Sequence, residues 1–132
     1  MWTVAGRRYW VDDEGQFHPA QGGDEPKLLV RDIRPGLPTE VDTDAIIAAR
    51  QLTSLLPELK EVAYAPVKGL HFVHTQGWML YLGTGDDMTH KVNVLRAIER
   101  QLSSAGTQQP SLVDIRYPET PYYRFPEQGA GE

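Results

Sequence analysis

The sequence predicts an α+β fold: a mainly antiparallel sheet with two helices packed on it and a strand at its C-terminal edge. Two stretches carry apolar residues at helical spacing, and several short stretches alternate between apolar and polar residues as half-buried strands do. The chain contains no internal repeat and no low-complexity segment. Its 132 residues are close to the common size of one domain, so a single hydrophobic core is expected.

The N-terminal part predicts a small meander of strands. Three short extended pieces are separated by turn residues: 2–4, 8–11 and 16–18. The apolar run Leu28-Leu29-Val30 then suits a buried strand that stops at Pro35.

The first helix is predicted near residues 43–56. Asp42 or Thr43 can cap it, and one stripe at helical spacing contains Ala45, Ala48, Ala49, Leu52, Leu55 and Leu56. Ile46 and Ile47 fall off this stripe, so the start of the helix needs a second neighbour or stays partly exposed.

The second helix is predicted near residues 87–104, ending at Gly106. Its expected inward residues are Met88, Val92, Leu95, Ile98 and Leu102, and its expected outward residues are Lys91, Arg96, Glu99 and Arg100.

Between the helices, KGLHFVHT and WMLYLG predict a hairpin that turns at Gln76-Gly77. Period-two alternation places Leu70, Phe72 and His74 on one face of the first strand. It likewise groups Trp78, Leu80 and Leu82 on the returning strand.

The composition argues against several function classes. The chain has 13 Lys and Arg residues against 18 Asp and Glu residues, and no basic cluster longer than Arg7-Arg8, so nucleic-acid binding is not expected. The absence of cysteine excludes disulfides and thiolate metal sites. No apolar run approaches the roughly 20 residues that span a bilayer, and no signal peptide is recognisable, so the chain is expected to be soluble.

No motif predicts catalysis, a metal or a cofactor. GTGDD before the second helix resembles a phosphate-binding loop, but its two aspartates lie where the anion would bind. His71 and His74 are three residues apart in a strand and therefore point to opposite faces. The pairs Asp12-Asp13 and Asp86-Asp87 occupy turn or capping positions. No Gly-x-Ser-x-Gly elbow is present.

The stretch SLVDIRYPETPYYRF, residues 111–125, carries the clearest functional signal. Val113, Ile115 and Tyr117 share one face of a predicted strand, and Asp114 and Arg116 on the other face are close enough to interact. Prolines at 118 and 121 favour a sheet edge. Such an edge either closes the sheet or accepts a strand from a partner, and both interpretations remain open. The aromatic pair Tyr122-Tyr123 beside Arg124 has the composition of a binding surface.

Several of these stretches together resemble the extracytoplasmic β domain of the FtsQ/DivIB bacterial cell-division proteins. They are WVDDEGQF, LKEVAYAP, GWMLYLGTGDDMTHKVNVLRAIERQL and SLVDIRYPETPYYR, in this order. The resemblance covers roughly residues 2–125 and implies that residues 1–126 form this domain and 127–132 a flexible tail. It also implies a cytoplasmic tail, a membrane span and a POTRA domain that are absent here, so the chain is interpreted as a recombinant fragment.

The resemblance implies a non-catalytic scaffold at the division septum, on the extracytoplasmic side of the cell membrane. Its implied partners are single-span coiled-coil division proteins of the FtsB/DivIC and FtsL type, bound by strand addition at the C-terminal edge. The candidate partner-binding residues are Arg116, Tyr117, Glu119, Thr120, Tyr122, Tyr123, Phe125 and, in the strand before the hairpin, Lys68. PETPYYRFP is richer in proline and tyrosine than many relatives are, which bears on how many backbone bonds a partner makes.

Two alternative functions remain open. An enzyme acting on cell-wall material requires convergent carboxylates in a cleft, and a carbohydrate-binding module requires an exposed aromatic platform. The three tryptophans, Trp2, Trp10 and Trp78, are the candidates for such a platform.

Overall fold

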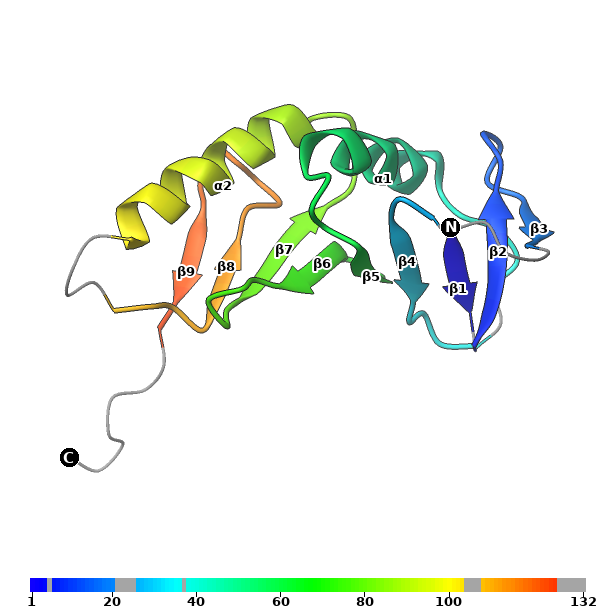
Figure 1. Cartoon of the computed structure of the whole chain (residues 1–132), viewed down its shortest axis with the longest axis horizontal. Coiled ribbons are helices and arrows are strands. Elements are labelled where there is room, and N and C mark those ends of the chain that lie inside the picture. The colour runs from blue at the N-terminus through cyan, green and yellow to red at the C-terminus, as the bar shows by residue number, and fades with distance from the viewer. Residues whose placement is uncertain (5, 21–25, 37, 104–107, 126–132) are drawn as a thin grey trace, which may run out of the picture.

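A computed structural model describes residues 1–4, 6–20, 26–36, 38–103 and 108–125. Within these residues, nine strands form one sheet in the order β3-β2-β1-β4-β5-β6-β7-β8-β9. Figure 1 shows both helices along one side of this sheet, with β3 at one end and β9 at the other. The α+β prediction is confirmed, including two helices packed on a sheet.

The strands are β1 Trp2–Val4, β2 Arg7–Val11, β3 Phe17–Pro19, β4 Leu29–Asp32, β5 Glu61–Ala65, β6 Gly69–Val73, β7 Met79–Gly83, β8 Leu112–Asp114 and β9 Tyr122–Arg124. The helices are α1 Thr43–Leu55 and α2 Met88–Leu102.

The sheet is mixed, although antiparallel pairs predominate. The pairs β1·β4, β4·β5 and β7·β8 are parallel, and the other five are antiparallel. In two of the parallel pairs, a helix connects the paired strands: α1 joins β4 to β5, and α2 joins β7 to β8. Parallel neighbours require such a crossover, because a tight turn only reverses the chain. Strand β5, within LKEVAYAP, was not predicted from periodicity.

Both helices confirm their predictions, with one correction in α2. Lys91 was predicted to point outward, but it is only 2% exposed. Its long side chain lies along the core, and its Nζ donates to the carbonyl oxygen of Thr84 at 2.9 Å and pairs with Asp87 at 3.2 Å. The predicted end at Gly106 lies outside the described residues.

The C-terminal stretch forms two strands instead of the single edge strand that was predicted. Strand β8 ends at Asp114, and the chain then bends through residues 116–120 and returns as β9. The edge position therefore belongs to β9. Prolines 118 and 121 lie in the connection, where no sheet hydrogen bond is required of them. Tyr117 does not share the buried face of Val113 and Ile115, because the alternation ends with β8.

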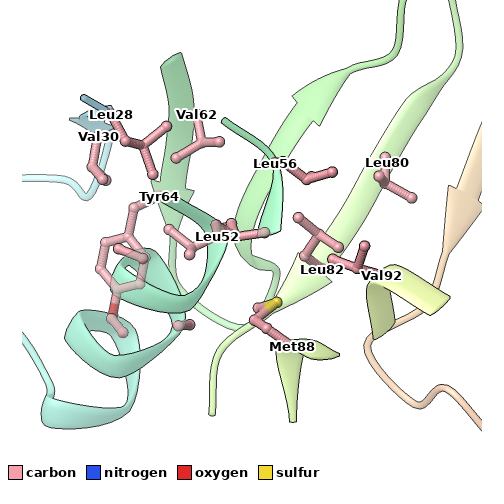
Figure 2. Packing of buried hydrophobic residues seen from close by; sticks show 14 of the residues in the cluster. Leu28, Val30, Leu52, Leu56, Val62, Tyr64, Leu80, Leu82, Met88 and Val92 are labelled. Atoms are coloured by element: carbon pink, nitrogen blue, oxygen red, sulfur yellow. The ribbon is translucent and has the colours of Figure 1, made fainter. Parts of the chain in front are cut away.

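The core lies between the helices and one face of the sheet. Figure 2 shows Leu52 and Leu56 from α1 and the segment after it, and Met88 and Val92 from α2, packed among side chains of β4, β5 and β7. Leu52, Leu80 and Leu82 are fully buried. Ile46, which falls off the main stripe of α1, is also buried and lines one pocket together with Trp2 of β1 and Val30 of β4. Neither helix in the described part of the chain is long and apolar enough to cross a membrane.

Candidate functional site

A row of side chains crosses the sheet face opposite the helices and ends at the open edge. Strand register aligns His71 with Tyr81, Tyr81 with Asp114, and Asp114 with Tyr122, across β6 to β9. Their neighbours in sequence, Leu80 and Val113, point into the core, so alternation directs the row to the helix-free face. Adjacent strands lie about 5 Å apart, so Tyr81 and Tyr122 are about 10 Å apart across this face.

Arg116 is held over this row by Asp114. Its Nε lies 3.0 Å from both carboxylate oxygens, and its Nη2 lies 2.6 Å from Oδ2. The interaction expected from the sequence is therefore confirmed. Burial raises the pKa of Asp114, but the hydrogen bonds from the Arg116 side chain and backbone outweigh burial and lower it overall. The same pairing raises the pKa of Arg116. Both groups are consequently charged at neutral pH.

Two cations lie over the ring of Tyr81. Lys68 Nζ is 5.0 Å from the ring centroid, and the guanidinium carbon of Arg116 is 5.9 Å from it. Lys68 was expected in a strand before the hairpin, but it lies in the turn between β5 and β6. A turn position gives its side chain the freedom to reach the helix-free face. The structure thus brings together Lys68 and Arg116, which lie 48 residues apart in sequence.

The Asp114–Arg116 arrangement has a twin elsewhere in the chain. Asp32 and Arg34 also flank an isoleucine, and Arg34 Nε and Nη2 bind both oxygens of Asp32 at 2.6–3.1 Å. Arg34 also lies over an aromatic ring, that of Tyr64, at 5.2 Å. The Asp-Ile-Arg clamp is thus a recurring local structure and does not by itself mark a binding site. The distinguishing features of the Arg116 clamp are the neighbouring Lys68 and the open edge.

Strand β9 carries aromatic residues on both of its faces. Tyr122 is 53% exposed and extends the row on the helix-free face. Tyr123, on the other face, packs partly against the core and stacks on Phe125 with ring centroids 6.3 Å apart. Phe125 itself remains 46% exposed. A segment lying beside β9 therefore meets apolar surface on either side.

The outer side of β9 presents unpaired backbone groups. The N–H of Ile115 donates to Tyr81 in β7, so Val113 and Ile115 direct their backbone groups toward β7. The intervening residues Leu112 and Asp114 face β9, where their register partners are Arg124 and Tyr122. The N–H and C=O of Tyr123 consequently point away from β8, and no other described strand pairs with them.

The connection between β8 and β9 holds three further predicted residues. Tyr117 is 70% exposed, and its carbonyl oxygen accepts a hydrogen bond from the Thr120 N–H at 3.0 Å. Thr120 is exposed, and Glu119 lies 3.6 Å from the ring of His90 in α2. The structure therefore places Tyr117 as a solvent-facing side chain at the corner of the edge, while Glu119 and Thr120 define the turn.

The opposite edge of the sheet is blunted. Strand β3 contains Pro19, which lacks a backbone N–H, and the residue before the strand, Gln16, pairs with Glu40. The two edges therefore differ, and β9 is the edge that retains both an unpaired backbone and exposed aromatic side chains.

A separate cavity of about 570 Å³ lies between the β6–β7 turn and the C-terminal half of α2. Among the described residues that line it, Glu99 is the sole carboxylate, and it accepts hydrogen bonds from His74 at 2.6 Å and Arg96 at 3.0 Å. Burial raises the pKa of Glu99, but these bonds lower it overall. A general acid requires a raised pKa, whereas the pKa of Glu99 is lowered. A glycosidase also requires a second carboxylate, and none is found among the described residues that line this cavity.

The tryptophans do not form a binding platform. Trp2 and Trp78 are 4% and 1% exposed, and only Trp10, at 40%, reaches the surface. The carbohydrate-binding alternative that relied on these three side chains is therefore excluded.

Sequence reasoning missed two residues of the site, Tyr81 and Val67. Tyr81 could have been found, because assigning Leu80 and Leu82 to the core leaves Tyr81 on the opposite face of the same strand. No sequence pattern indicates Val67 as a residue of the site, since an exposed valine in a turn is recognisable only from the backbone conformation.

Comparison with known proteins gives one family. Residues 1–116 match the family described as Cell division protein FtsQ/DivIB, C-terminal. The chain belongs to the FtsQ/DivIB family. The matched range includes Lys68, Tyr81 and Arg116, and it ends before Tyr117 and β9. No curated protein matches the chain.

Membership confirms the resemblance found in the sequence and gives the protein a role in bacterial cell division. FtsQ/DivIB proteins are membrane-anchored, non-enzymatic scaffolds that interact with other division proteins. A surface for protein contact is therefore the kind of site that this fold must provide.

Proposed function

We propose that this domain binds small single-span coiled-coil division proteins of the FtsB/DivIC and FtsL type by accepting a strand of the partner at β9. The observation that carries the proposal is the unpaired outer side of β9, where the backbone groups of Tyr123 are free among the described residues. Strand addition satisfies such groups by main-chain hydrogen bonds and gains specificity from side chains on alternate faces.

The side chains around β9 suit an extended segment with apolar residues. Tyr117, Tyr122 and Phe125 are all more than two-fifths exposed, at 70%, 53% and 46%. Large exposed side chains of this kind are enriched in the energetically dominant positions of interfaces. The short length of β9 limits the number of backbone bonds, so much of the affinity has to come from these side chains.

The charges over Tyr81 favour an acidic group on the partner. Arg116 is neutralised by Asp114, but Lys68 has no carboxylate within ion-pair distance among the described residues. A partner carboxylate placed over Tyr81 meets Lys68 directly and is supported by Arg116. Lys68 therefore adds selectivity and association rate, while the aromatic residues supply the buried area.

The proposal includes the absence of catalysis and places the domain on the extracytoplasmic side of the cell membrane at the division septum. The lowered pKa of Glu99 and the hydrogen bonds of the His74 ring support a structural role for the cavity that Glu99 and His74 line. The membrane anchor of the family supports the location. A purified protein that hydrolyses cell-wall material would contradict this part of the proposal.

The test compares Tyr123→Pro with Tyr123→Ala. Both variants lose the tyrosine side chain, but only proline also removes the outward N–H, and an edge strand tolerates proline on its open side. Binding to the extracytoplasmic segment of the FtsB-type protein from the same genome is measured by calorimetry, and folding by circular dichroism. We expect Tyr123→Pro to bind at least tenfold more weakly than Tyr123→Ala. Equal affinities of two folded variants would show that the partner does not pair with β9.

A pull-down from solubilised membranes complements this measurement. The intact chain is compared with a variant that ends at Tyr117, which removes β9. Recovery of the division proteins by both forms would locate the partner site elsewhere on the domain.

A further inference from the structure

Val67 occupies a strained turn between β5 and β6. The N–H of Lys68 donates to the carbonyl oxygen of Pro66 at 2.7 Å, which closes a three-residue turn with Val67 at its centre. Val67 has φ +67°, and it is the only non-glycine residue with a positive φ in the described part of the chain. The positive-φ form of this turn is the rare and strained one, and a β-branched side chain makes it still less favourable.

The valine side chain gives the folded domain no compensation for this strain. It is 89% exposed, the most exposed large apolar residue that the structure describes. Glycine or asparagine would adopt the same backbone conformation more readily. The isopropyl group therefore lowers stability without contributing buried area, and such conflicts between local preference and fold are expected at functional positions.

The strained turn is tied to the site described above. Arg116 Nη1 donates to the carbonyl oxygen of Val67 at 3.3 Å, and the next residue, Lys68, lies over Tyr81. Val67 thus presents an apolar group immediately beside two cations. A partner segment that brings a carboxylate to Lys68 can place an adjacent apolar side chain against Val67.

We propose that Val67 is a specificity-determining contact of the partner, selecting a segment in which an apolar residue neighbours an acidic one. This inference rests on the proposed function. The partner surface then extends from β9 across the helix-free face to the β5–β6 turn, so strand addition alone does not define it. The strain at Val67 is retained because the exposed side chain is used in binding.

The test uses two substitutions that separate strain from contact. Val67→Asn removes the apolar group and relieves the backbone, whereas Val67→Thr replaces one methyl group with a hydroxyl but keeps the β-branch and the strain. Val73→Thr is the control, because Val73 is also exposed, at 60%, and lies at the far end of β6. Affinity for the extracytoplasmic segment of the FtsB-type protein and the melting temperature are measured for all four proteins.

We expect Val67→Asn to melt about 3 °C or more above the wild type and to bind about tenfold more weakly. Val67→Thr should bind several-fold more weakly with an unchanged melting temperature, and Val73→Thr should match the wild type in affinity. Wild-type affinity in Val67→Asn, when the wild type itself binds, would overturn the inference on Val67 alone. A wild type that does not bind the segment would overturn the proposed function and this inference together.

Discussion

Arg116 and Asp114 form a planar clamp, with Nε 3.0 Å from both carboxylate oxygens and Nη2 2.6 Å from Oδ2. The clamp orients the guanidinium over Tyr81 and leaves Nη1 directed to the β5–β6 turn. Local hydrogen bonds therefore fix a side chain that would otherwise lose considerable rotamer entropy on binding a partner. The geometry of the site therefore depends on the carboxylate of Asp114, which lies in the same row of side chains on the helix-free face.

Asp114→Asn should lower the free energy of unfolding by about 1.5 kcal/mol or more at pH 7, because it weakens charge-assisted hydrogen bonds in a partly buried setting. The pKa of Asp114 is lower in the folded protein than its ordinary value of 3.8. Its stabilisation is therefore complete above about pH 5 and is lost as the pH falls through the folded-state pKa. The gap between wild type and variant, measured by urea denaturation, should shrink from pH 5 downward. A gap that is constant with pH would show that the charge is not responsible.

The twin clamp supplies the matched control for binding. Asp32→Asn disturbs an Arg34 clamp of the same geometry that is remote from β9. It should lower stability without affecting affinity for the partner segment, whereas Asp114→Asn should affect both.

Tyr117→Ala and Tyr123→Ala should have different effects. Tyr117 is 70% exposed, so its truncation should leave the melting temperature unchanged and weaken partner binding at least tenfold, which corresponds to about 1.4 kcal/mol or more. Tyr123 packs partly against the core, so Tyr123→Ala should lower stability as well as affinity. Full binding by both folded variants would exclude this edge as the site. Val113→Asp places a charge at a fully buried position and should unfold the domain. This variant therefore shows how damage to the core differs from a loss of binding alone.

The sequence was sufficient for elements whose periodicity is long or whose turns are distinct. Helix α2 shows five apolar positions on one face, and the hairpin of β6 and β7 turns at the predicted Gln76-Gly77. Parallel pairing was not predictable in the same way, because it depends on which strands a helix brings side by side. Strand β5 was not predicted, because Val62, Ala63 and Tyr64 are all buried and so show no alternation of apolar and polar residues.

The site was predictable only where its residues are close in sequence. Asp114, Arg116 and the aromatic residues that follow them lie within one stretch, and their composition indicated a binding edge. The bend after Asp114, which separates β8 from β9 and leaves Tyr117 exposed, interrupts the period-two alternation that had placed Tyr117 on the buried face. The approach of Lys68 to Arg116 depends on strand order in the sheet, and no local pattern encodes it.

Lys91→Met should destabilise the domain by about 1–3 kcal/mol, although the two side chains are similar in volume. Lys91 is 2% exposed, and methionine leaves the carbonyl oxygen of Thr84 without its hydrogen bond. Arg100→Met is the control, since Arg100 lies on the exposed side of the same helix and its loss should change stability by less than about 0.5 kcal/mol. Chemical denaturation measures both. Equal stability of the Lys91→Met variant and the wild type would mean that water satisfies the Thr84 carbonyl oxygen.

Lys68→Glu should weaken partner binding chiefly through the association rate. Lys68 lies over Tyr81 without a carboxylate partner among the described residues, so reversing its charge places repulsion where an acidic group is expected to approach. The effect should diminish from 50 mM to 500 mM salt, because exposed charges are screened over about 10 Å at 0.1 M and less at higher salt. Lys60→Glu, a reversal at another exposed lysine, is the control for net charge. Stopped-flow measurement of both variants tests this directly. If Lys68→Glu and Lys60→Glu slow association equally, the loss reflects overall charge, and Lys68 does not meet an acidic group of the partner.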